Sequence, residues 1–310
     1  MAKILVTGGA GFIGSHVVDT YIEAGHEVVV VDNLIAGKRE HVNAKARFCE
    51  LDIRSKELAD ILAQEKPQYV SHLAAQIDVR RSLEDPMFDA GVNVLGSLNV
   101  LEHCVKQGVK KFVFASTGGA IYGEPEILPA PEECPAKPKC HYGASKLAVE
   151  GYIQLYGTLY GLPYTILRFP NVYGPRQSPE GEAGVCSILI GRMLQGKTPV
   201  LYGYGQPLRD YVYVGDIARA CLLALDKGDG TTLNLGSGKG TSVRTLFDIL
   251  QELVGFQGEA DLQPARPGEV ERSYITGERA AVLLGWRPEV ALLDGLGRTA
   301  EYIRRQASSA

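Results

Sequence analysis

Tyr142 and Lys146 are the two side chains whose types and spacing in this sequence suggest acid–base chemistry. They stand four residues apart in the stretch YGASK, so on a helix they lie on one face. Neither group is a base near neutrality on its own, because each has an ordinary pKa of about 10. A lysine ammonium beside the tyrosine ring favours the phenolate and lowers its pKa. The pair is a candidate proton-transfer site, although an exposed helix face with this spacing is also common.

A glycine-rich segment near the start has the pattern of a phosphate-binding loop. TGGAGFIG stands between an apolar strand pattern and an amphipathic helix pattern. Gly8 and Gly11 permit a tight turn and close approach of a pyrophosphate, while Gly14 lets the helix pack on the strand. Asp32 follows about 20 residues later at the end of the next expected strand, where a carboxylate favours NAD over NADP. The alternative for Asp32 is a turn residue.

The elements that must position these residues alternate between strand and helix through the first half of the chain. Such alternation predicts an α/β fold with a Rossmann-type, doubly wound parallel sheet. The hydroxyls of Ser116 and Thr117 close the fifth expected strand, at the crevice where the YGASK helix begins. The expected strands are 3–7, 27–32, 47–52, 69–74, 112–116 and 164–169, and the expected helices are 15–24, 56–66, 97–107 and 142–160.

A change in the sequence pattern near residue 174, towards more Gly and Pro and shorter helices, predicts a second, smaller C-terminal α/β lobe. Segments punctuated by Gly and Pro follow, with shorter helices expected at 187–195, 216–225 and 243–254. We therefore divide the chain into a dinucleotide-binding domain at 1–174 and a substrate lobe at 175–310. Segments near 210–240, including an expected strand at 232–236, return to the first domain.

Composition narrows the classes of partner. The 310 residues are 45% hydrophobic and 22% charged, with a net charge of −4, which gives no basic surface for nucleic acid or membrane lipid. No secretory signal or membrane-spanning apolar run is seen, so we expect a cytoplasmic protein. The six scattered cysteines predict reduced thiols. Cys134, Cys140 and His141 lack the further ligands of a closed metal site, and we expect none.

Five ordered motifs together resemble the extended short-chain dehydrogenase/reductase family, specifically its sugar-nucleotide enzymes of the UDP-glucose 4-epimerase type. They are the glycine loop, Asp32, STGGAIYGE, YGASK and LRFPNVYGPRQ, and the likeness runs from Ile4 to about Pro288. The resemblance implies that Tyr142 is the catalytic base, that Lys146 holds the nicotinamide ribose, and that Thr117 bonds the sugar's 4-oxygen. Counting back from Tyr122 places Gly118 at the hydroxyl position instead, but glycine has no hydroxyl, so Thr117 is preferred and Ser116 is the reserve candidate.

The resemblance also implies the residues that bind NAD and a UDP-sugar. Ile77 departs from the family, because it stands where the best-known epimerases carry a lysine near the cofactor phosphates. Arginine suits phosphate because its planar fork binds two oxygens, although Arg209 could instead pair with Asp210. The implied cofactor contacts are Gly8, Gly11, Phe12, Ile13, Gly14, Asp32, Asn33, Asp52, Ile53, Leu73, Ala74, Ala75, Asn93, Tyr142, Lys146 and Phe169. The implied substrate contacts are Thr117, Asn171, Val200, Tyr202, Arg209, Arg266 and Glu269.

The implied reaction is epimerisation at C4 of a UDP-hexose through a transient 4-keto intermediate, with NAD regenerated in each cycle. Related 4,6-dehydratases carry Asp-Glu where this chain has Gly118 and Gly119, which favours epimerisation over elimination of water. Ser273 matches a position where a small residue admits N-acetyl sugars, so we expect dual substrate use. The alternatives are a UDP-glucuronate epimerase or decarboxylase, or a non-catalytic NAD-binding sensor.

The resemblance further implies a homodimer through the helices near 97–107 and 147–160. Leu147, Val149, Ile153 and Tyr156 are the apolar positions that fit such an interface, but they fit a buried core face equally well.

Overall fold

Seven parallel strands form the central sheet of the protein, which is a computed structural model describing residues 1–179, 184–266 and 270–309. Their order is β11-β6-β5-β4-β1-β2-β3. The order reverses direction between β1 and β4, and in such sheets the crevice at this point binds ligands. The strands are β1 (Lys3–Thr7), β2 (Glu27–Asp32), β3 (Arg47–Glu50), β4 (Tyr69–His72), β5 (Lys111–Thr117), β6 (Tyr164–Phe169) and β11 (Thr231–Asn234).

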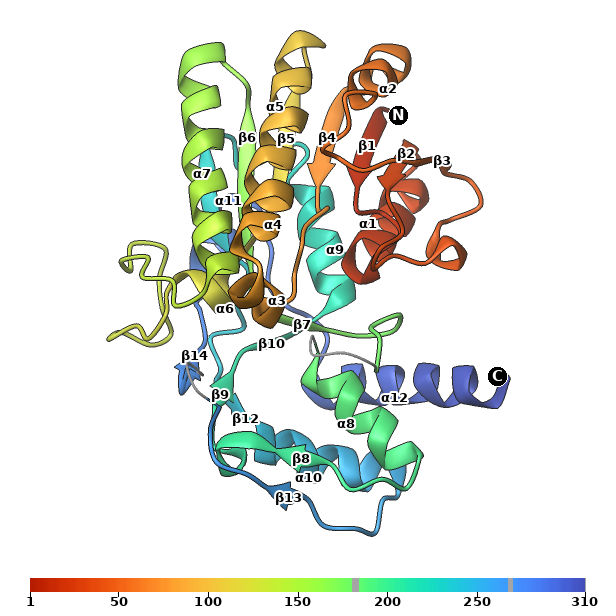
Figure 1. The fold of residues 1–310 in the computed structure, drawn as a ribbon, viewed down its shortest axis with the longest axis vertical. Helices are drawn as coiled ribbons and strands as arrows, with labels where there is room; N and C mark the ends of the chain where they lie inside the picture. The colour runs from red at the N-terminus through yellow and green to blue at the C-terminus, as the bar shows by residue number, and fades with distance from the viewer. Residues whose placement is uncertain (180–183, 267–269, 310) are drawn as a thin grey trace.

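Two separate apolar cores cover the two faces of this sheet. Alternate residues of β1 point to opposite faces: Ile4 and Val6 pack into one core and Leu5 into the other. Helices α1 (Phe12–Glu23) and α9 (Val214–Leu223) cover the first face. The second face is covered by α2 (Leu58–Glu65), α5 (Gly96–Lys106) and α7 (His141–Tyr160). Figure 1 shows this layered arrangement in its upper half, and the predicted doubly wound fold is confirmed.

The predicted strands 47–52 and 69–74 extend too far, and the first helix begins earlier than predicted. β3 ends at Glu50 rather than residue 52, because the Asp52 side chain accepts the Arg54 N–H at 2.9 Å and makes a turn. β4 ends at His72 rather than residue 74, because the Ala74 N–H turns to the Thr7 hydroxyl at 3.2 Å. Helix α1 begins at Phe12, directly after the glycine loop.

Three short helical segments lead from β4 towards α5. They are α3 (Val79–Glu84), α4 (Pro86–Ala90) and a π-helical turn (Gly91–Leu95) that runs on into α5, with Asp78 and Asp85 capping the first two. Pro86 stands at the first position of α4, where its fixed φ suits a helix start. This run places Asp89 and Asn93 beneath the amino end of α7.

The second lobe packs around a third core at the carboxyl end of the sheet, in the lower half of Figure 1. Among the described residues no helix is long and apolar enough to cross a membrane. Strands β7 (Asn171–Tyr173) and β10 (Tyr211–Tyr213) pair between the two lobes. The lobe contains α8 (Val185–Leu194), α10 (Val243–Val254) and α12 (Leu292–Ser309), with short strands β8 (Val200–Leu201), β9 (Leu208–Arg209), β12 (Thr241–Ser242), β13 (Asp261–Leu262) and β14 (Arg272–Ser273).

Candidate active site

The glycine loop forms a cradle that no side chain could enter. Gly8 has a φ of +74°, and a Cβ atom there would lie 2.6 Å from the Ala74 backbone nitrogen. A Cβ on Gly14 would lie 2.0 Å from the Gly8 carbonyl oxygen. Gly11 is the N-cap of α1 and offers no side-chain cap, so the N–H groups of Phe12 and Ile13 stay available to an anion. The cradle therefore fits the pyrophosphate of a dinucleotide.

Asp32 joins the glycine loop to the turn after β2. Its buried carboxylate accepts the Ala10 N–H at 3.0 Å and the Leu34 N–H at 2.9 Å. The side chain thus makes a turn contact and also fixes the loop that would hold a phosphate.

Asp52 is held mainly by its own neighbours. The Arg54 guanidinium donates to it at 2.9 and 2.8 Å, and the Asn33 amide donates at 2.9 Å. Hydrogen bonds from Arg54 hold the pKa of the Asp52 carboxyl well below its usual range. Ile53 is buried and packs against Gly96 at the start of α5. The structure therefore places Asn33, Asp52 and Ile53 together at the ends of β2 and β3.

Tyr142 and Thr117 meet at the carboxyl end of β5. Tyr142 lies in the first turn of α7 and is half-buried. Burial raises the pKa of the Tyr142 phenol well above its usual value, as do the nearby groups of Cys140 and Asp89, whereas a hydrogen bond with Thr117 acts in the opposite direction. The phenol is therefore protonated without a further positive charge nearby.

Lys146 follows this phenol by four residues on the same helix. It is 3% exposed, and its ammonium donates to the Ala115 carbonyl at 2.9 Å and lies 4.6 Å from the centre of the Phe114 ring. Burial lowers the pKa of Lys146 to about 8, while Asp89 and Glu150 act to raise it. The ammonium can therefore lose its proton within the range in which enzymes commonly operate.

Ser116 and Thr117 point into different surroundings. The Ser116 hydroxyl donates to Glu150 at 2.5 Å, and Glu150 is the buried partner of Arg168 at 2.6 Å. Thr117 hydrogen-bonds Tyr142 instead. Ser116 therefore supports a buried ion pair, whereas Thr117 faces the candidate base.

The loop after β4 carries Leu73, Ala74 and Ala75 and is tied to Asn93. The Gln76 N–H donates to the Asn93 side-chain oxygen at 2.9 Å, and the Asn93 amide donates to the Gln76 carbonyl at 3.0 Å. Phe169 closes β6 directly beside Thr117 in the sheet register. All of the implied cofactor residues from the first two β–α units and from β4 to β6 thus border the carboxyl edge of the sheet.

Gly119 is the point at which the catalytic and substrate residues converge. A Cβ placed on Gly119 would lie 3.6 Å from the Asn171 side-chain oxygen and 3.9 Å from the Thr117 hydroxyl. The Ser273 hydroxyl lies 3.5 Å from the Gly119 carbonyl. A Cβ on neighbouring Gly118 would meet Ile275 at 2.4 Å. An acidic side chain at Gly118, as in dehydratases, would therefore require the Ile275 side chain to move.

Short strands in the second lobe hold the remaining implied substrate residues. In the strand register Arg209 stands beside Ser273, and its guanidinium donates to the Leu208 carbonyl at 2.9 Å. The Asp210 carboxylate accepts both the N–H and the hydroxyl of Ser237, which leaves Asp210 engaged away from its neighbour.

Tyr202 and Arg266 form a stacked pair in the same lobe. The Arg266 guanidinium carbon lies 3.5 Å from the centre of the Tyr202 ring, and Val200 is two residues away in β8. A stacked guanidinium on an aromatic face is a common cation–π arrangement. Glu269 lies outside the described residues.

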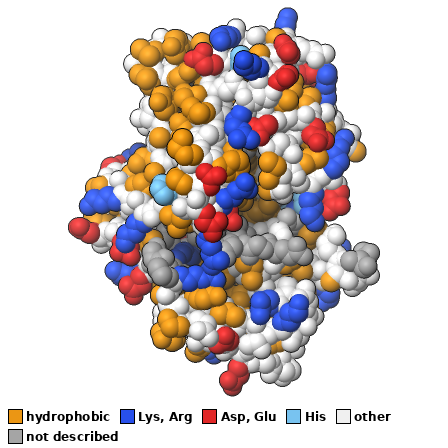
Figure 2. Space-filling model, in the orientation of Figure 1, with side chains coloured by type: hydrophobic (Ala, Val, Ile, Leu, Met, Phe, Trp, Pro, Cys, Tyr) orange, Lys and Arg blue, Asp and Glu red, His pale blue; other side chains and the backbone are white. Residues whose placement is uncertain are grey.

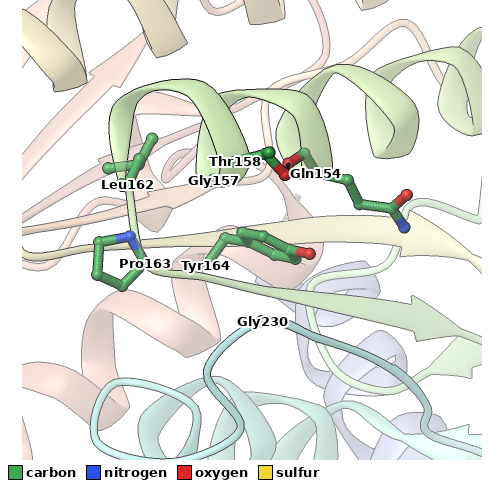
Figure 3. A pocket seen from close by; sticks show the side chains of 8 residues that line it. Gln154, Gly157, Thr158, Leu162, Pro163, Tyr164 and Gly230 are labelled. Atoms are coloured by element: carbon green, nitrogen blue, oxygen red, sulfur yellow. Dashed lines mark hydrogen bonds between the residues drawn. The ribbon is translucent and has the colours of Figure 1, made fainter.

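One depression in the described structure lies far from these residues. It has a volume of about 280 Å³ and lies at the carboxyl end of α7, between Gln154, Thr158 and Tyr164 (Figure 3). Tyr142 is at the opposite end of that helix, and the depression carries no charged side chain. We therefore place the active site by its reactive groups.

Sequence reasoning missed three residues that hold this site together, namely Gln76, Asp89 and Ser145. Each is buried and makes hydrogen bonds that link the loop after β4 to α7. The spacing of Asp89 and Asn93, four apart on a helix, is the sequence signal that could have drawn attention to Asp89.

Comparisons with known proteins agree with this geometry. Residues 4–236 match the model of the NAD dependent epimerase/dehydratase family. The chain is 42% identical to the UDP-glucose 4-epimerase of Mycolicibacterium smegmatis, covering 98% of this chain and 99% of that protein. It superposes with a TM-score of 0.97 and 49% identity on the Thermotoga maritima UDP-glucose 4-epimerase with UDP-glucose. The superposition covers 98% of this chain and 99% of that chain. The superposition on the Thermus thermophilus UDP-glucose 4-epimerase in complex with NAD has a TM-score of 0.93 and 46% identity. It covers 97% of this chain and 99% of that chain.

Proposed function

The chain belongs to the NAD-dependent epimerase/dehydratase family, and from that premise we propose that it catalyses epimerisation at C4 of a UDP-hexose with bound NAD. The observation that carries the proposal is the meeting of Tyr142 and Thr117 near buried Lys146, at the same carboxyl edge of the sheet as the glycine cradle. UDP-glucose and UDP-galactose are the expected pair of substrates, through a transient 4-keto sugar.

The residues of the glycine cradle hold the dinucleotide. Tyr142, Thr117 and Lys146 carry out the proton transfer. When bound, NAD supplies the reversible oxidation of C4. Tyr142 takes the proton of the 4-hydroxyl as that carbon is oxidised and returns it when the carbon is reduced again. Thr117 orients the sugar oxygen towards the phenol. Lys146, one helical turn after Tyr142, would place a positive charge on the side of the phenolate that forms.

The second lobe binds the rest of the sugar nucleotide in this proposal. Arg209 and Arg266 bind the two phosphates with their planar forks, and Tyr202 lies along the base. Asn171 reaches the sugar from the side of Gly119. Cofactor binding then falls in 1–174 and most of the sugar-nucleotide binding in 175–310, while Thr117 and Asn171 contact the sugar from the first domain and the segments around 210–240 are shared.

The test is conversion of UDP-galactose to UDP-glucose by the purified protein, followed by proton NMR. Turnover without added reductant or oxidant is expected, because the cofactor is regenerated in each cycle. A UDP-glucuronate epimerase or decarboxylase would instead act on UDP-glucuronate, which is tested in parallel. A non-catalytic sensor would bind NAD and convert none of these sugars, and that result would contradict the proposal.

A homodimer is the assembly we propose, formed through α5 and α7. Val149, Ile153 and Tyr156 are buried in the second core, so they serve packing within one chain. Further exposed apolar residues remain on α7 and on the π-helical turn before α5, and Figure 2 shows apolar side chains gathered over this part of the molecule. They are Leu95 on the turn and Tyr152, Leu155, Leu159 and Tyr160 on α7. Sedimentation analysis of the protein and of Leu159→Glu would detect the dimer and its loss.

A further inference from the structure

The buried carboxylate of Asp89 touches three segments that meet under the amino end of α7. Asp89 has no exposed surface. One carboxylate oxygen accepts the side-chain amides of Gln76 and Asn93, both at 3.0 Å. The other oxygen accepts the Ser145 hydroxyl at 2.6 Å. A buried carboxylate with three donors is well satisfied, and the removal of the Ser145 hydroxyl would leave one of its oxygens without a donor.

The Gln76 and Asn93 side of this contact leads to the cofactor loop. Asn93 and Gln76 exchange two further hydrogen bonds, which fix the loop just after Leu73 to Ala75. The Asn93 carbonyl also accepts the Ser97 hydroxyl at 2.6 Å. Ser97 in turn contacts His72 at 2.9 Å, and His72 contacts Thr7 at 2.6 Å. An unbroken chain of buried polar contacts therefore runs from Asp89 to the strand that precedes the glycine cradle.

The Ser145 side of the contact leads to the catalytic helix. Ser145 lies between Tyr142 and Lys146 within YGASK, one turn after the phenol. The hydrogen bond from Ser145 to Asp89 therefore fixes the position of α7 against the cofactor loop. A buried ammonium such as that of Lys146 also requires negative charge in its surroundings.

We propose that Asp89 is a positioning residue of the active site, which holds α7 in register with the cofactor loop and supplies negative charge beside Tyr142 and Lys146. The inference rests on the proposed function, because its activity measurements use UDP-hexose turnover. Because Asp89 has no exposed surface, the role assigned to it is indirect, through Ser145 and Asn93.

The charged and titratable groups around Asp89 determine what its loss would do. On α7 these are Tyr142, Lys146, Glu150 and, at the cap, Cys140. Glu150 is paired with Arg168 of β6. From β4, His72 contributes no charge, because burial lowers its pKa to about 3. From the solvent side, Arg54 and Arg81 stack on the Phe88 ring next to Asp89.

Asp89→Asn separates the charge of this residue from its shape. The amide oxygen can still accept from Gln76 and Asn93, and the amide nitrogen can donate to the Ser145 oxygen. Without the negative charge, the pKa values of both Lys146 and Tyr142 fall. Both limbs of the pH profile of kcat should then move to lower pH by about one unit, while NADH affinity is unchanged.

Ser145→Ala separates the hydrogen bond from the charge. The carboxylate remains, so the limbs of the profile stay in place. We expect kcat to fall about tenfold with an unchanged KM, because the loosened helix misplaces Tyr142.

Two substitutions serve as matched controls. Asp85→Asn removes a carboxylate four residues away that caps α4 from an exposed position, and asparagine caps equally well. Ser82→Ala removes a buried hydroxyl on α3 that bonds only its own helix at 2.6 Å. Both controls should keep the wild-type pH profile and kcat.

The experiment measures kcat and KM from pH 5 to 10 with the NAD-loaded proteins, together with NADH binding. Unmoved limbs in Asp89→Asn, or an equal shift in Asp85→Asn, would overturn the inference. If Asp89→Asn does not fold, Ser145→Ala decides: a loss in kcat alone supports the inference and wild-type kinetics overturn it.

Absence of turnover in the wild-type protein would contradict the proposed function alone. The inference is then judged by stability. Because the folded-state pKa of Lys146 lies below its unfolded value, the unfolding free energy rises as pH passes upwards through the folded-state pKa. That rise should begin at lower pH in Asp89→Asn, and a rise at the same pH in both proteins would overturn the inference.

Discussion

The cofactor side and the substrate side of the active site are constructed in opposite ways. On the cofactor side, Lys146 is 3% exposed, and Asp89 and His72 are fully buried with partners inside the chain. On the substrate side, Asn171 is exposed and Arg209 and Arg266 are half-buried on or beside strands of two or three residues. One side is a rigid part of the folding core, while the other is an open surface.

The difference follows from what each side must do. Proton transfer depends on pKa values and on orientation, and both are set most strongly where water is excluded and polar networks are complete. A sugar nucleotide must enter and leave, so its phosphate-binding groups have to remain solvated without substrate. Loss of a cofactor-side residue should therefore affect kcat, and loss of a substrate-side residue should affect KM.

Tyr142→Phe should have the largest effect. It removes the phenolic oxygen and leaves the ring and its packing, so kcat should fall by about 10³-fold or more, with KM and bound NAD little changed. Steady-state kinetics with UDP-galactose and the NAD content of the purified protein give the two readouts. Tyr152→Phe, on the exposed side of the same helix, is the control. Retention of a tenth of the activity would show that another group is the base.

Lys146→Met should follow, with a loss in kcat of about 10²-fold and a gain in stability. The pKa of Lys146 falls from 10.5 to about 8 on folding, so burying the charged form costs up to about 3 kcal/mol below pH 8. This cost disappears as pH rises from about 8 to 10.5, where the unfolded chain holds the proton and the folded chain does not. The variant should therefore be more stable than wild type at pH 7 and lose that advantage by pH 10.5. Urea unfolding at both pH values measures the difference, and a variant destabilised at pH 7 would contradict it.

The same contrast explains which parts were accessible from the sequence. Strands β1, β2 and β6 have the bounds expected from their apolar runs, and the glycine loop, Asp32 and YGASK follow local patterns with a stated chemistry. The role of Asp89 depends on Gln76, Asn93 and Ser145, which only the fold brings together. The ends of β3 and β4 were missed because side chains of Asp52 and Thr7 replace backbone partners there.

Arg266→Lys tests the substrate side. Lysine keeps the charge but loses the planar fork and the stacking on Tyr202, so KM for UDP-galactose should rise about tenfold with kcat nearly unchanged. Arg244→Lys is a matched control in the same lobe, because that guanidinium also stacks on an aromatic ring, at 5.5 Å from Phe247. A tenfold fall in kcat for Arg266→Lys, as large as the expected rise in KM, would show that this side also positions the reacting carbon. The contrast between the two sides would then fail.

Ser273→Tyr should have the smallest effect on the reaction and the clearest effect on choice of sugar. The Ser273 hydroxyl lies 3.5 Å from the Gly119 carbonyl, beside Thr117 and Asn171, where a substituent on the sugar would be accommodated. A tyrosine ring there would fill the space for an N-acetyl group, while a hydroxyl at the same carbon needs less room. The ratio of UDP-N-acetylglucosamine to UDP-glucose turnover should fall about tenfold, which corresponds to the 1–3 kcal/mol that one small group contributes in a shaped pocket. Ser273→Ala, which keeps the space open, should leave the ratio as it is. An unchanged ratio in Ser273→Tyr would mean that the N-acetyl group lies elsewhere, and that the open side of the site selects its sugar through Asn171 and the arginines instead.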